Sequence, residues 1–486
     1  MELFNTFSQN LDELIWSLPL VILCLAVGLF LSIRLRFPQI RLLPDQIKLI
    51  AGLDEASKKQ RKSGQGISAF QSFATTVGAR VGMGNIAGIA SAIYFGGPGA
   101  ILWMWIIALI GAASAFTEST LAQAYKAKNP EGVFTGGPAH YLERGLKCKP
   151  YAMVFAILAV IATGLLLPGV QINSLVIVFE EAFDVNRVVV GAVCCVLLAI
   201  VICGGIKRIA HLAEVLTPVM CLVYIALALI ILGIHITEIP AALVLIFQSA
   251  FGLHPIFGAI IGSAVSWGVK RGIYSNEAGM GCGAIVSAAA ECSHPAKQGL
   301  IQSCSIYVDT LLVGTATALI VILTGMYDVV DAQGALLLDQ TGGIEAGIIW
   351  TQSALVSTYG GWCGKLLSII IVLFVFTSMT GYCYQAESNT NYLFKGNKYA
   401  IWVVRAIFVA AAFFGCLVEA DAIWALGDVG YGLMAWANII AITLLSPMAV
   451  KLLKDYEKQK KEGKDPTFDP ADFGIEDPTG AWAHKD

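Results

Sequence analysis

The run at residues 78–99, GARVGMGNIAGIASAIYFGGPG, combines residues that a plain lipid-facing helix does not tolerate. It is apolar enough to cross a bilayer, yet it contains repeated glycines together with Arg80 and Asn85. Irregular backbone at membrane depth is tolerated only where it is buried in protein or lines a cavity. An unwound segment at residues 81–85 would free carbonyl oxygens for a cation and direct half-helix amides toward a carboxylate. The pattern therefore favours a ligand site inside a broken membrane helix.

The glycines of this run allow two interpretations. Gly82 and Gly84 permit unusual backbone angles and the close approach of a ligand, which Asn85 beside them could bind directly. Gly84 and Gly88 also have the four-residue spacing of a helix-packing face. Because packing alone does not explain the polar Arg80 and Asn85, we favour the broken helix.

A second stretch, KRGIYSNEAGMGCGAIVSAA at residues 270–289, repeats this combination of glycines and polar side chains. Polar groups at membrane depth usually face the protein interior or water, which predicts that this stretch also lines a site. We expect Tyr274 to form a pocket wall, and Asn276 with the amides near Gly279 to contact a ligand. A competing interpretation makes the stretch a cytoplasmic loop and moves the break upstream, to residues 262–268.

Isolated polar residues lie inside three other apolar runs. Gln171 either hydrogen-bonds a neighbouring helix or contacts a ligand. Thr377 and Ser378 are adjacent hydroxyls that either bond the preceding helical turn or supply oxygen ligands for a small cation. Asp309 lies mid-helix, where a carboxylate predicts a functional site, although a structural hydrogen bond explains it equally well.

The composition predicts a membrane protein and excludes several classes of enzyme. Hydrophobic residues make up 57% and charged residues 13% of the 486 positions, whereas soluble proteins have about 25% charged residues. The sequence contains no P-loop, no HExxH motif and no nucleophile elbow. We therefore expect no enzymatic activity, no ATP-driven transport by this chain alone and no nucleic-acid partner. The twelve cysteines lack metal-ligand spacing and predict core packing.

Eleven apolar runs are close to the length of about 20 residues that a membrane-spanning helix needs. They lie at residues 14–34, 67–94, 99–125, 151–180, 187–204, 214–235, 256–290, 298–325, 362–392, 400–418 and 424–449. Lysine and arginine gather after the first, third and fifth runs, whereas residues 326–361 contain acidic residues and no basic one. This distribution predicts an N-terminus outside and a C-terminus inside.

Two glycine-rich elements suggest an internal repeat. GMGNIAGIASA at residues 82–92 and GMGCGAIVSAA at residues 279–289 are similar and lie five spans apart. Such elements cross the membrane in opposite directions, as in an inverted repeat whose interrupted helices meet at a transporter's central site. We therefore divide the chain into an N-terminal helix with a basic loop (1–65), two repeat halves (66–235 and 236–450) and a charged tail without a core pattern (451–486).

Longer blocks of the sequence resemble the alanine or glycine:cation symporter family. They are GNIAGIA (84–90), GGPGAILWMWIIALIG (96–111), GGIKRIAHLAEVLTPVM (204–220), KRGIYSNEAGMGCGA (270–284) and SHPAKQGLIQ (293–302). The resemblance implies an all-α polytopic membrane protein of the leucine-transporter type, in which one extra helix precedes a five-plus-five inverted repeat. It also implies import of a small neutral amino acid, usually alanine or glycine, coupled to sodium and without a covalent cofactor. The implied location is a bacterial or archaeal inner membrane.

The resemblance also implies roles for individual residues. The substrate positions are Gly82, Gly84 and Asn85 in the first broken helix, Gln171 in the third core helix, Tyr274 with NEAG in the sixth and Tyr382 near an aromatic position of the eighth. The sodium site that this fold shares is implied at Thr377 and Ser378 with the carbonyls of Gly78 and Val81.

Three departures from the family pattern are visible in this sequence. Met83 stands where the family usually has threonine, Tyr382 where tryptophan is common, and Leu102 where an aromatic residue is usual. The first two leave glutamine or serine open as the substrate besides alanine or glycine. The third predicts a change in packing only.

Several mechanisms are compatible with this sequence. One is sodium-coupled symport by alternating access, and its nearest rival is proton-coupled symport with Asp309 or Glu277 as the proton carrier. A channel or a substrate-sensing receptor on the same scaffold is a third, although the short tail after Lys451 does not resemble a signalling domain.

Overall fold

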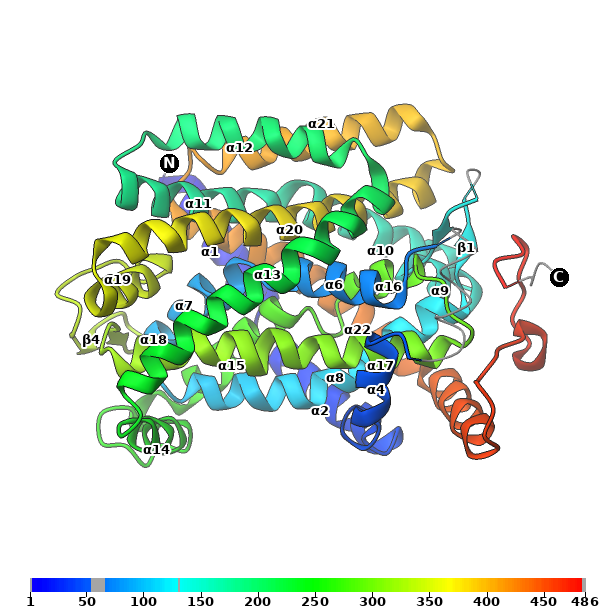
Figure 1. The fold of residues 1–486 in the computed structure, drawn as a ribbon, viewed down its shortest axis with the longest axis horizontal. Helices are drawn as coiled ribbons and strands as arrows, with labels where there is room; N and C mark the ends of the chain where they lie inside the picture. Colours follow the sequence, from blue (N-terminus) through cyan, green and yellow to red (C-terminus); the bar gives the residue numbers. More distant parts are fainter. Residues whose placement is uncertain (1, 54–65, 130–131, 483–486) are drawn as a thin grey trace.

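Helices make up nearly all of the regular structure in the computed structural model, which describes residues 2–53, 66–129 and 132–482 (Figure 1). Part of the predicted basic loop, residues 54–65, lies outside the described residues. The helices up to residue 234 are α1 (Glu2–Ile15), α2 (Leu18–Arg34), α3 (Pro38–Arg41), α4 (Leu43–Ile50), α6 (Ala69–Arg80), η1 (Met83–Asn85), α7 (Ala87–Gly96), α8 (Ala100–Ala124), α9 (Pro138–Arg144), α10 (Lys149–Ile161), η2 (Ala162–Leu166), α11 (Leu167–Phe183), α12 (Arg187–Ile202) and α13 (Gly205–Ile234).

The remaining helices are α14 (Ile239–Ala250), η3 (Gly258–Ile260), α15 (Ile261–Asn276), α16 (Cys282–Ala288), α17 (Pro295–Ile306), η4 (Tyr307–Gly314), α18 (Thr315–Leu323), α19 (Ile348–Tyr359), α20 (Gly361–Phe394), α21 (Lys398–Phe414), α22 (Ala420–Lys461) and η5 (Pro470–Phe473). Two small antiparallel hairpins pair β1 (Ala127–Lys128) with β2 (Phe134–Thr135), and β3 (Val329–Val330) with β4 (Leu336–Leu338). α14 and α19 lie in segments that the sequence analysis assigned to loops. Each has only 12 residues, which is too short for a membrane span, so a search for spans did not detect them.

Within the described residues, six segments are long and apolar enough to cross a membrane. They are Ala100–Ala124, Lys149–Phe183, Gly205–Ile234, Pro295–Leu323, Gly361–Phe394 and Ala420–Lys461. α1 and α2, which meet at a bend of 41°, together form a seventh candidate. The chain is therefore an integral membrane protein.

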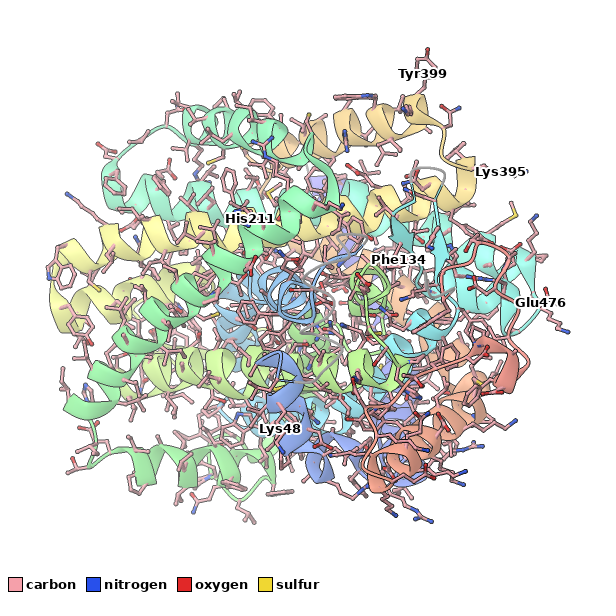
Figure 2. All side chains as sticks on the ribbon, turned by 45° about the vertical axis from the view of Figure 1, so that its right-hand side comes forward. Lys48, Phe134, His211, Lys395, Tyr399 and Glu476 are labelled. Carbon is pink, nitrogen blue, oxygen red and sulfur yellow. The ribbon has the colours of Figure 1, made fainter. Side chains whose placement is uncertain are left out.

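The outer helices present apolar side chains to their surroundings. On α13, Leu222 is 70% and Leu229 is 61% exposed, which suits lipid and would be costly in water. α12 and α21 lie together along one edge of the bundle, and Tyr399 projects from the start of α21 (Figures 1 and 2). α6 and α16 lie near the centre, where the interrupted helices meet (Figure 1).

Two helices are interrupted where the sequence contains its glycine-rich stretches. α6 and α7 are separated by residues 81–86, which contain only the short helix η1. α15 and α16 are separated by residues 277–281. Because α15 is continuous through residues 262–268, the alternative that placed the second break there is wrong. A Cβ atom on Gly268 would lie 2.5 Å from the Ala100 carbonyl oxygen, so this glycine permits close packing of α15 on α8.

Two helices also contain π-helical stretches. η2 lies between α10 and α11, and η4 lies between α17 and α18 and includes Asp309. A π-helical turn widens the helix and frequently occurs at functional sites, because it shifts the direction of the side chains around it. The expected mid-helix carboxylate thus lies on a widened segment.

The C-terminal tail packs against the bundle, although its sequence shows no core pattern. Phe468, Ile475 and Trp482 are at most 7% exposed and belong to the main hydrophobic cluster. Trp482 Nε1 donates a hydrogen bond to the Gln123 carbonyl oxygen at 3.3 Å, and Lys126 Nζ lies 4.0 Å from the Trp482 ring. The tail therefore covers the end of α8. The sequence missed this because the buried residues after the end of α22 are widely spaced and follow no helical period.

We expect Trp482→Ala to lower the free energy of unfolding by about 3 kcal/mol, the low end of the range for a buried aromatic side chain. Thermal denaturation in detergent and hydrogen exchange at residues 465–482 would measure the loss. Trp362→Ala removes a tryptophan that is 59% exposed and should leave both readouts nearly unchanged. Equal stability of the two variants would contradict the docking of the tail.

Candidate functional site

A buried polar cluster surrounds the first interruption. Asn85 Nδ2 donates a hydrogen bond to Asp309 Oδ1 at 2.7 Å, and Ser275 Oγ donates to Asp309 Oδ2 at 2.9 Å. Ser275 Oγ also contacts Asn85 Oδ1, and Thr310 Oγ1 donates to Asp309 Oδ2 at 2.8 Å. All four side chains are at most 1% exposed. The cluster thus brings oxygen atoms from η1, α15 and η4 to one point inside the bundle.

Gly82 lies between two polar side chains that the sequence predicted near a ligand. A Cβ atom on Gly82 would be 2.5 Å from Ser378 Oγ and 3.2 Å from Gln171 Oε1. Gln171 Oε1 accepts a hydrogen bond from the Met83 N–H at 3.4 Å, and Gln171 Nε2 donates to Tyr382 Oη at 3.4 Å. The interrupted helix, α11 and α20 therefore meet at Gly82, where a Cβ atom would require Ser378 or the backbone to move.

The adjacent hydroxyls of α20 have different partners. Ser378 Oγ donates to the Gly78 carbonyl oxygen at 3.1 Å, so it faces α6. Thr377 Oγ1 lies 3.0 Å from the carbonyl oxygens of both Leu373 and Phe374 in its own helix. Ser378 therefore contacts the Gly78 carbonyl, which the sequence analysis named as a sodium ligand. Thr377 instead bonds the preceding turn of its own helix, which is the purely structural interpretation of this hydroxyl.

A further hydroxyl at this point was missed by the sequence analysis. Thr217 Oγ1 of α13 donates to the Ala74 carbonyl oxygen at 3.0 Å and would lie 2.6 Å from a Cβ atom on Gly78. Val81 ends α6 with φ −72° and ψ 85°, which turns its carbonyl away from the helical direction. The only signal for Thr217 was its place beside Pro218 inside an apolar run.

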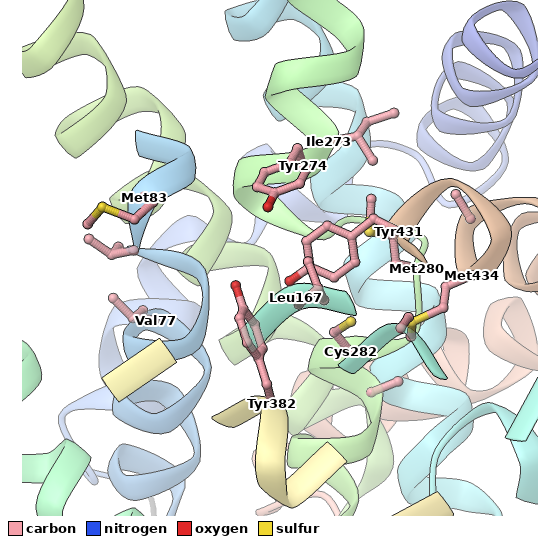
Figure 3. Close-up of a cluster of buried hydrophobic side chains, with 14 of the residues drawn as sticks. Val77, Met83, Leu167, Ile273, Tyr274, Met280, Cys282, Tyr382, Tyr431 and Met434 are labelled. Atoms are coloured by element: carbon pink, nitrogen blue, oxygen red, sulfur yellow. The ribbon is translucent and has the colours of Figure 1, made fainter. Parts of the chain in front are cut away.

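Three tyrosines form an aromatic cluster near both interruptions. The ring centroids of Tyr274 and Tyr431 are 5.0 Å apart, and those of Tyr382 and Tyr431 are 6.2 Å apart, in edge-on arrangements. Figure 3 shows the three hydroxyl groups directed toward one another, with Met83 and Val77 opposite them. A Cβ atom on Gly84 would lie 3.2 Å from Tyr274 Cδ1. Tyr431 was not predicted, because its local sequence does not distinguish it from a packing residue.

The second interruption begins with residues in the left-handed region of backbone space. Glu277 has φ 54°, Gly279 has φ 83° and Gly281 has φ 90°. The glycines adopt these angles freely, whereas a glutamate does so only where its surroundings require it. Tyr431 Oη donates a hydrogen bond to Glu277 Oε1, and Glu277 Oε2 has no partner among the described residues.

Side chains from other helices hold this second interruption. Glu118 Oε2 of α8 accepts from the Gly281 N–H at 3.0 Å and from Asn438 Nδ2 at 2.9 Å. Asn438 Nδ2 also donates to the Gly279 carbonyl oxygen at 2.9 Å. Gly279 thus packs on α22. Glu118 was missed, although a carboxylate inside an apolar run is the same signal that identified Asp309.

Asn276 is the remaining predicted residue of this stretch. Its Oδ1 accepts from the Ala278 N–H at 3.0 Å, which stabilises the turn out of α15. Its Nδ2 has no hydrogen-bond partner in the described part of the chain, as is also true of Tyr274 Oη. Both atoms are buried, so each is a candidate contact for a polar ligand.

Arg80 connects the two interrupted helices. Its Nη1 hydrogen-bonds Ser305 Oγ and the Gln302 carbonyl oxygen of α17, and its Nη2 would lie 2.6 Å from a Cβ atom on Gly283 of α16. The end of α6 therefore packs on the start of α16, through an arginine that is 2% exposed.

Lys270 and Arg271 form ion pairs at one end of α15. Lys270 Nζ lies 2.8 Å from Asp428 Oδ2 and 2.6 Å from Asp12 Oδ2, and Arg271 Nη1 lies 2.8 Å from Asp428 Oδ1. These residues line a cavity of about 500 Å³ together with Trp424. Their polarity is thus explained by ion pairs that join α1, α15 and α22.

The chain matches known proteins along nearly its whole length. A family model described as "Sodium:alanine symporter family" matches residues 1–470. The chain is 48% identical over 471 residues to the "Putative sodium/proton-dependent alanine carrier protein YrbD" of Bacillus subtilis, covering 96% of each chain. It is 42% identical over 457 residues to the "Probable sodium/glutamine symporter GlnT" of the same organism, covering 94% of this chain and 91% of that protein.

The fold is also similar to that of solved structures. The crystal structure of MhsT in complex with L-phenylalanine matches with a TM-score of 0.55, covering 80% of this chain and 98% of MhsT. Because the two chains are 14% identical, the similarity concerns the fold alone.

We expect Gly82→Ala to lower the free energy of unfolding by about 1–3 kcal/mol, as overpacking of a filled core does. The added methyl group would require Ser378 or the broken helix to move. Gly233→Ala is a matched control, because a Cβ atom there meets nothing within 4 Å. Thermal denaturation of both variants in the same detergent measures the difference, and equal melting temperatures would contradict the close approach at Gly82.

Proposed function

The chain belongs to the sodium:alanine symporter family, and we propose that it imports a small neutral amino acid together with sodium by alternating access. Membership of a transporter family implies that the chain is not an enzyme. The observation that carries the proposal is the meeting of two interrupted helices at a buried cluster of oxygen atoms around Asp309. Unwound backbone of this kind supplies both amides for a carboxylate and carbonyls for a cation.

The architecture that we propose has eleven spans, with one extra N-terminal helix before a five-plus-five inverted repeat of the leucine-transporter type. The similarity to the fold of MhsT supports it, as do interruptions at corresponding places in the two halves. We assign the N-terminus to the outside and the tail to the inside of a bacterial or archaeal cytoplasmic membrane. The distribution of lysine and arginine in the loops supports this orientation.

For the substrate, we propose that the carboxylate binds the amides of residues 82–85, including Gly84, with Gln171 beside them. Tyr274 and Tyr382 would limit the size of the amino-acid side chain. Asn276 Nδ2 is a candidate donor, because it is buried without a partner among the described residues. Gly279 would act indirectly, since Asn438 already binds its carbonyl oxygen.

For sodium, we propose ligands from the α6 terminus and from α20. The Ser378 hydroxyl and the carbonyls of Gly78 and Val81 would bind the ion, and the hydrogen bond of Ser378 to Gly78 supports their proximity. The Thr377 hydroxyl would have to turn away from its own helix to join them. A cation moving inward gains about 2.3 kcal/mol per 100 mV of membrane potential, which is sufficient to drive accumulation.

Proton coupling is the alternative that a specific observation favours. Asp309 accepts hydrogen bonds from Asn85, Ser275 and Thr310, none of which carries a charge. Glu277 has one oxygen without a partner in the described ranges. The carrier YrbD is named as sodium/proton-dependent, so an experiment must test both ions.

Glutamine or serine is the alternative substrate, supported by the likeness to GlnT and by Met83 in the broken helix.

Uptake of alanine, glutamine and serine into proteoliposomes tests the function. We expect saturable accumulation against a gradient that requires an inward sodium gradient and fails with a proton gradient alone. Accumulation driven by protons alone would contradict sodium coupling, and flux that never exceeds equilibrium would indicate a channel. Failure of all three amino acids, and of glycine assayed in the same way, would contradict the substrate class.

We expect Thr377→Ala with Ser378→Ala to raise the sodium concentration for half-maximal uptake at least tenfold, because two oxygen ligands are lost. Asp309→Asn serves as the contrast, since it keeps the size of the side chain and removes its charge. It removes the coupling charge if Asp309 carries it, but it also turns an amide NH2 toward side chains that now donate to Asp309, so its thermal stability is measured beside its uptake. Undiminished sodium dependence of the double variant would remove the hydroxyl pair from the mechanism.

A further inference from the structure

Tyr431 of α22 is placed to act on the substrate pocket, although the sequence gives no indication of it. Its side chain is fully buried. Its ring centroid lies 5.0 Å from that of Tyr274 and 6.2 Å from that of Tyr382. These are the two residues that we propose as pocket walls. Figure 3 shows the three hydroxyl groups directed toward the same point, so Tyr431 shares one cluster with the other two rings.

The position of the Tyr431 ring is fixed at its hydroxyl end. Tyr431 Oη donates a hydrogen bond to Glu277 Oε1, and Glu277 is the first residue of the second interruption. Glu277 has φ 54°, so its backbone is held in the left-handed region, which few non-glycine residues adopt. A phenol bonded to a residue on a constrained turn has less freedom than one held by packing alone.

We propose that Tyr431 is a specificity-determining residue, and that its hydrogen bond to Glu277 holds the ring where it excludes large amino-acid side chains. This inference rests on the proposed function, because it assumes that the pocket between Tyr274 and Tyr382 receives the substrate side chain. It gives Glu277 a positioning role that requires a hydrogen-bond acceptor and does not require a charge. It also makes α22 part of the pocket.

The experiment compares how well alanine, leucine and phenylalanine inhibit alanine uptake. For Tyr431→Leu, we expect inhibition by leucine and phenylalanine to strengthen at least tenfold relative to alanine. Space for one added methylene already changes discrimination by about 10–200-fold. Tyr431→Phe keeps the ring and loses the hydrogen bond, so we expect a smaller shift in the same direction. Tyr224→Phe is the matched control, because it removes a buried tyrosine hydrogen bond, to Thr317, outside this cluster.

Variants of Glu277 separate the hydrogen bond from the charge. Glu277→Gln keeps an acceptor oxygen for Tyr431 and should retain the wild-type ratio of inhibition constants. Glu277→Ala should shift that ratio as Tyr431→Phe does, and combining the two should add nothing further, as expected for partners in one interaction. If a Glu277 variant does not transport, the relative affinities for alanine, leucine and phenylalanine are measured from the rise in melting temperature that each amino acid causes.

The outcomes distinguish this inference from the proposed function. If the wild-type protein accumulates none of the tested amino acids, the proposed function fails. If wild-type uptake proceeds and Tyr431→Leu keeps the wild-type ratio, the role of Tyr431 is overturned and the symporter remains. A ratio that shifts equally in Tyr224→Phe would also overturn it, because the effect would then be a general loss of packing.

Discussion

Unwound backbone inside a membrane must find polar partners within the protein, and the rest of this structure depends on how it does so. Water is absent from the hydrocarbon region, where each unpaired amide or carbonyl costs several kcal/mol. The chain meets this constraint twice, at residues 81–86 and 277–281. At the first interruption the Met83 N–H donates to Gln171 Oε1, and at the second the Gly281 N–H donates to Glu118 Oε2. Buried polar side chains on otherwise apolar helices follow from this requirement.

The same requirement connects elements that are distant in the sequence. Asp309 is bonded from η1 and α15, while Asn438 of α22 holds Gly279. Arg80 joins the end of α6 to α17 and packs on α16. A movement of one broken helix must therefore disturb partners on several others. The alternating access that we propose would use such coupling, because a substrate or an ion that replaced one partner would change the balance for all of them.

Not every group in the centre is satisfied by the protein. Tyr274 Oη, Asn276 Nδ2 and Glu277 Oε2 are buried and lack partners among the described residues. Native proteins leave few such atoms, and these three lie within four residues of one another, beside the proposed substrate site. A zwitterionic ligand offers both an acceptor and donors to complete them. The tail, in contrast, packs against the end of α8, where Lys126 lies over the Trp482 ring.

The sequence by itself determined the lipid environment, the two glycine-rich interruptions and the family, because composition, length and local pattern are sufficient for these. It also singled out Asn85, Gln171, Ser378 and Asp309, since a polar residue in an apolar run is conspicuous without any partner. It could not decide which of them meet, because Asn85 and Asp309 are 224 residues apart. Only the tertiary structure decided that Tyr431 bonds Glu277 and that Glu118 holds the second break. Contacts between distant helices depend on packing geometry, which no local spacing records.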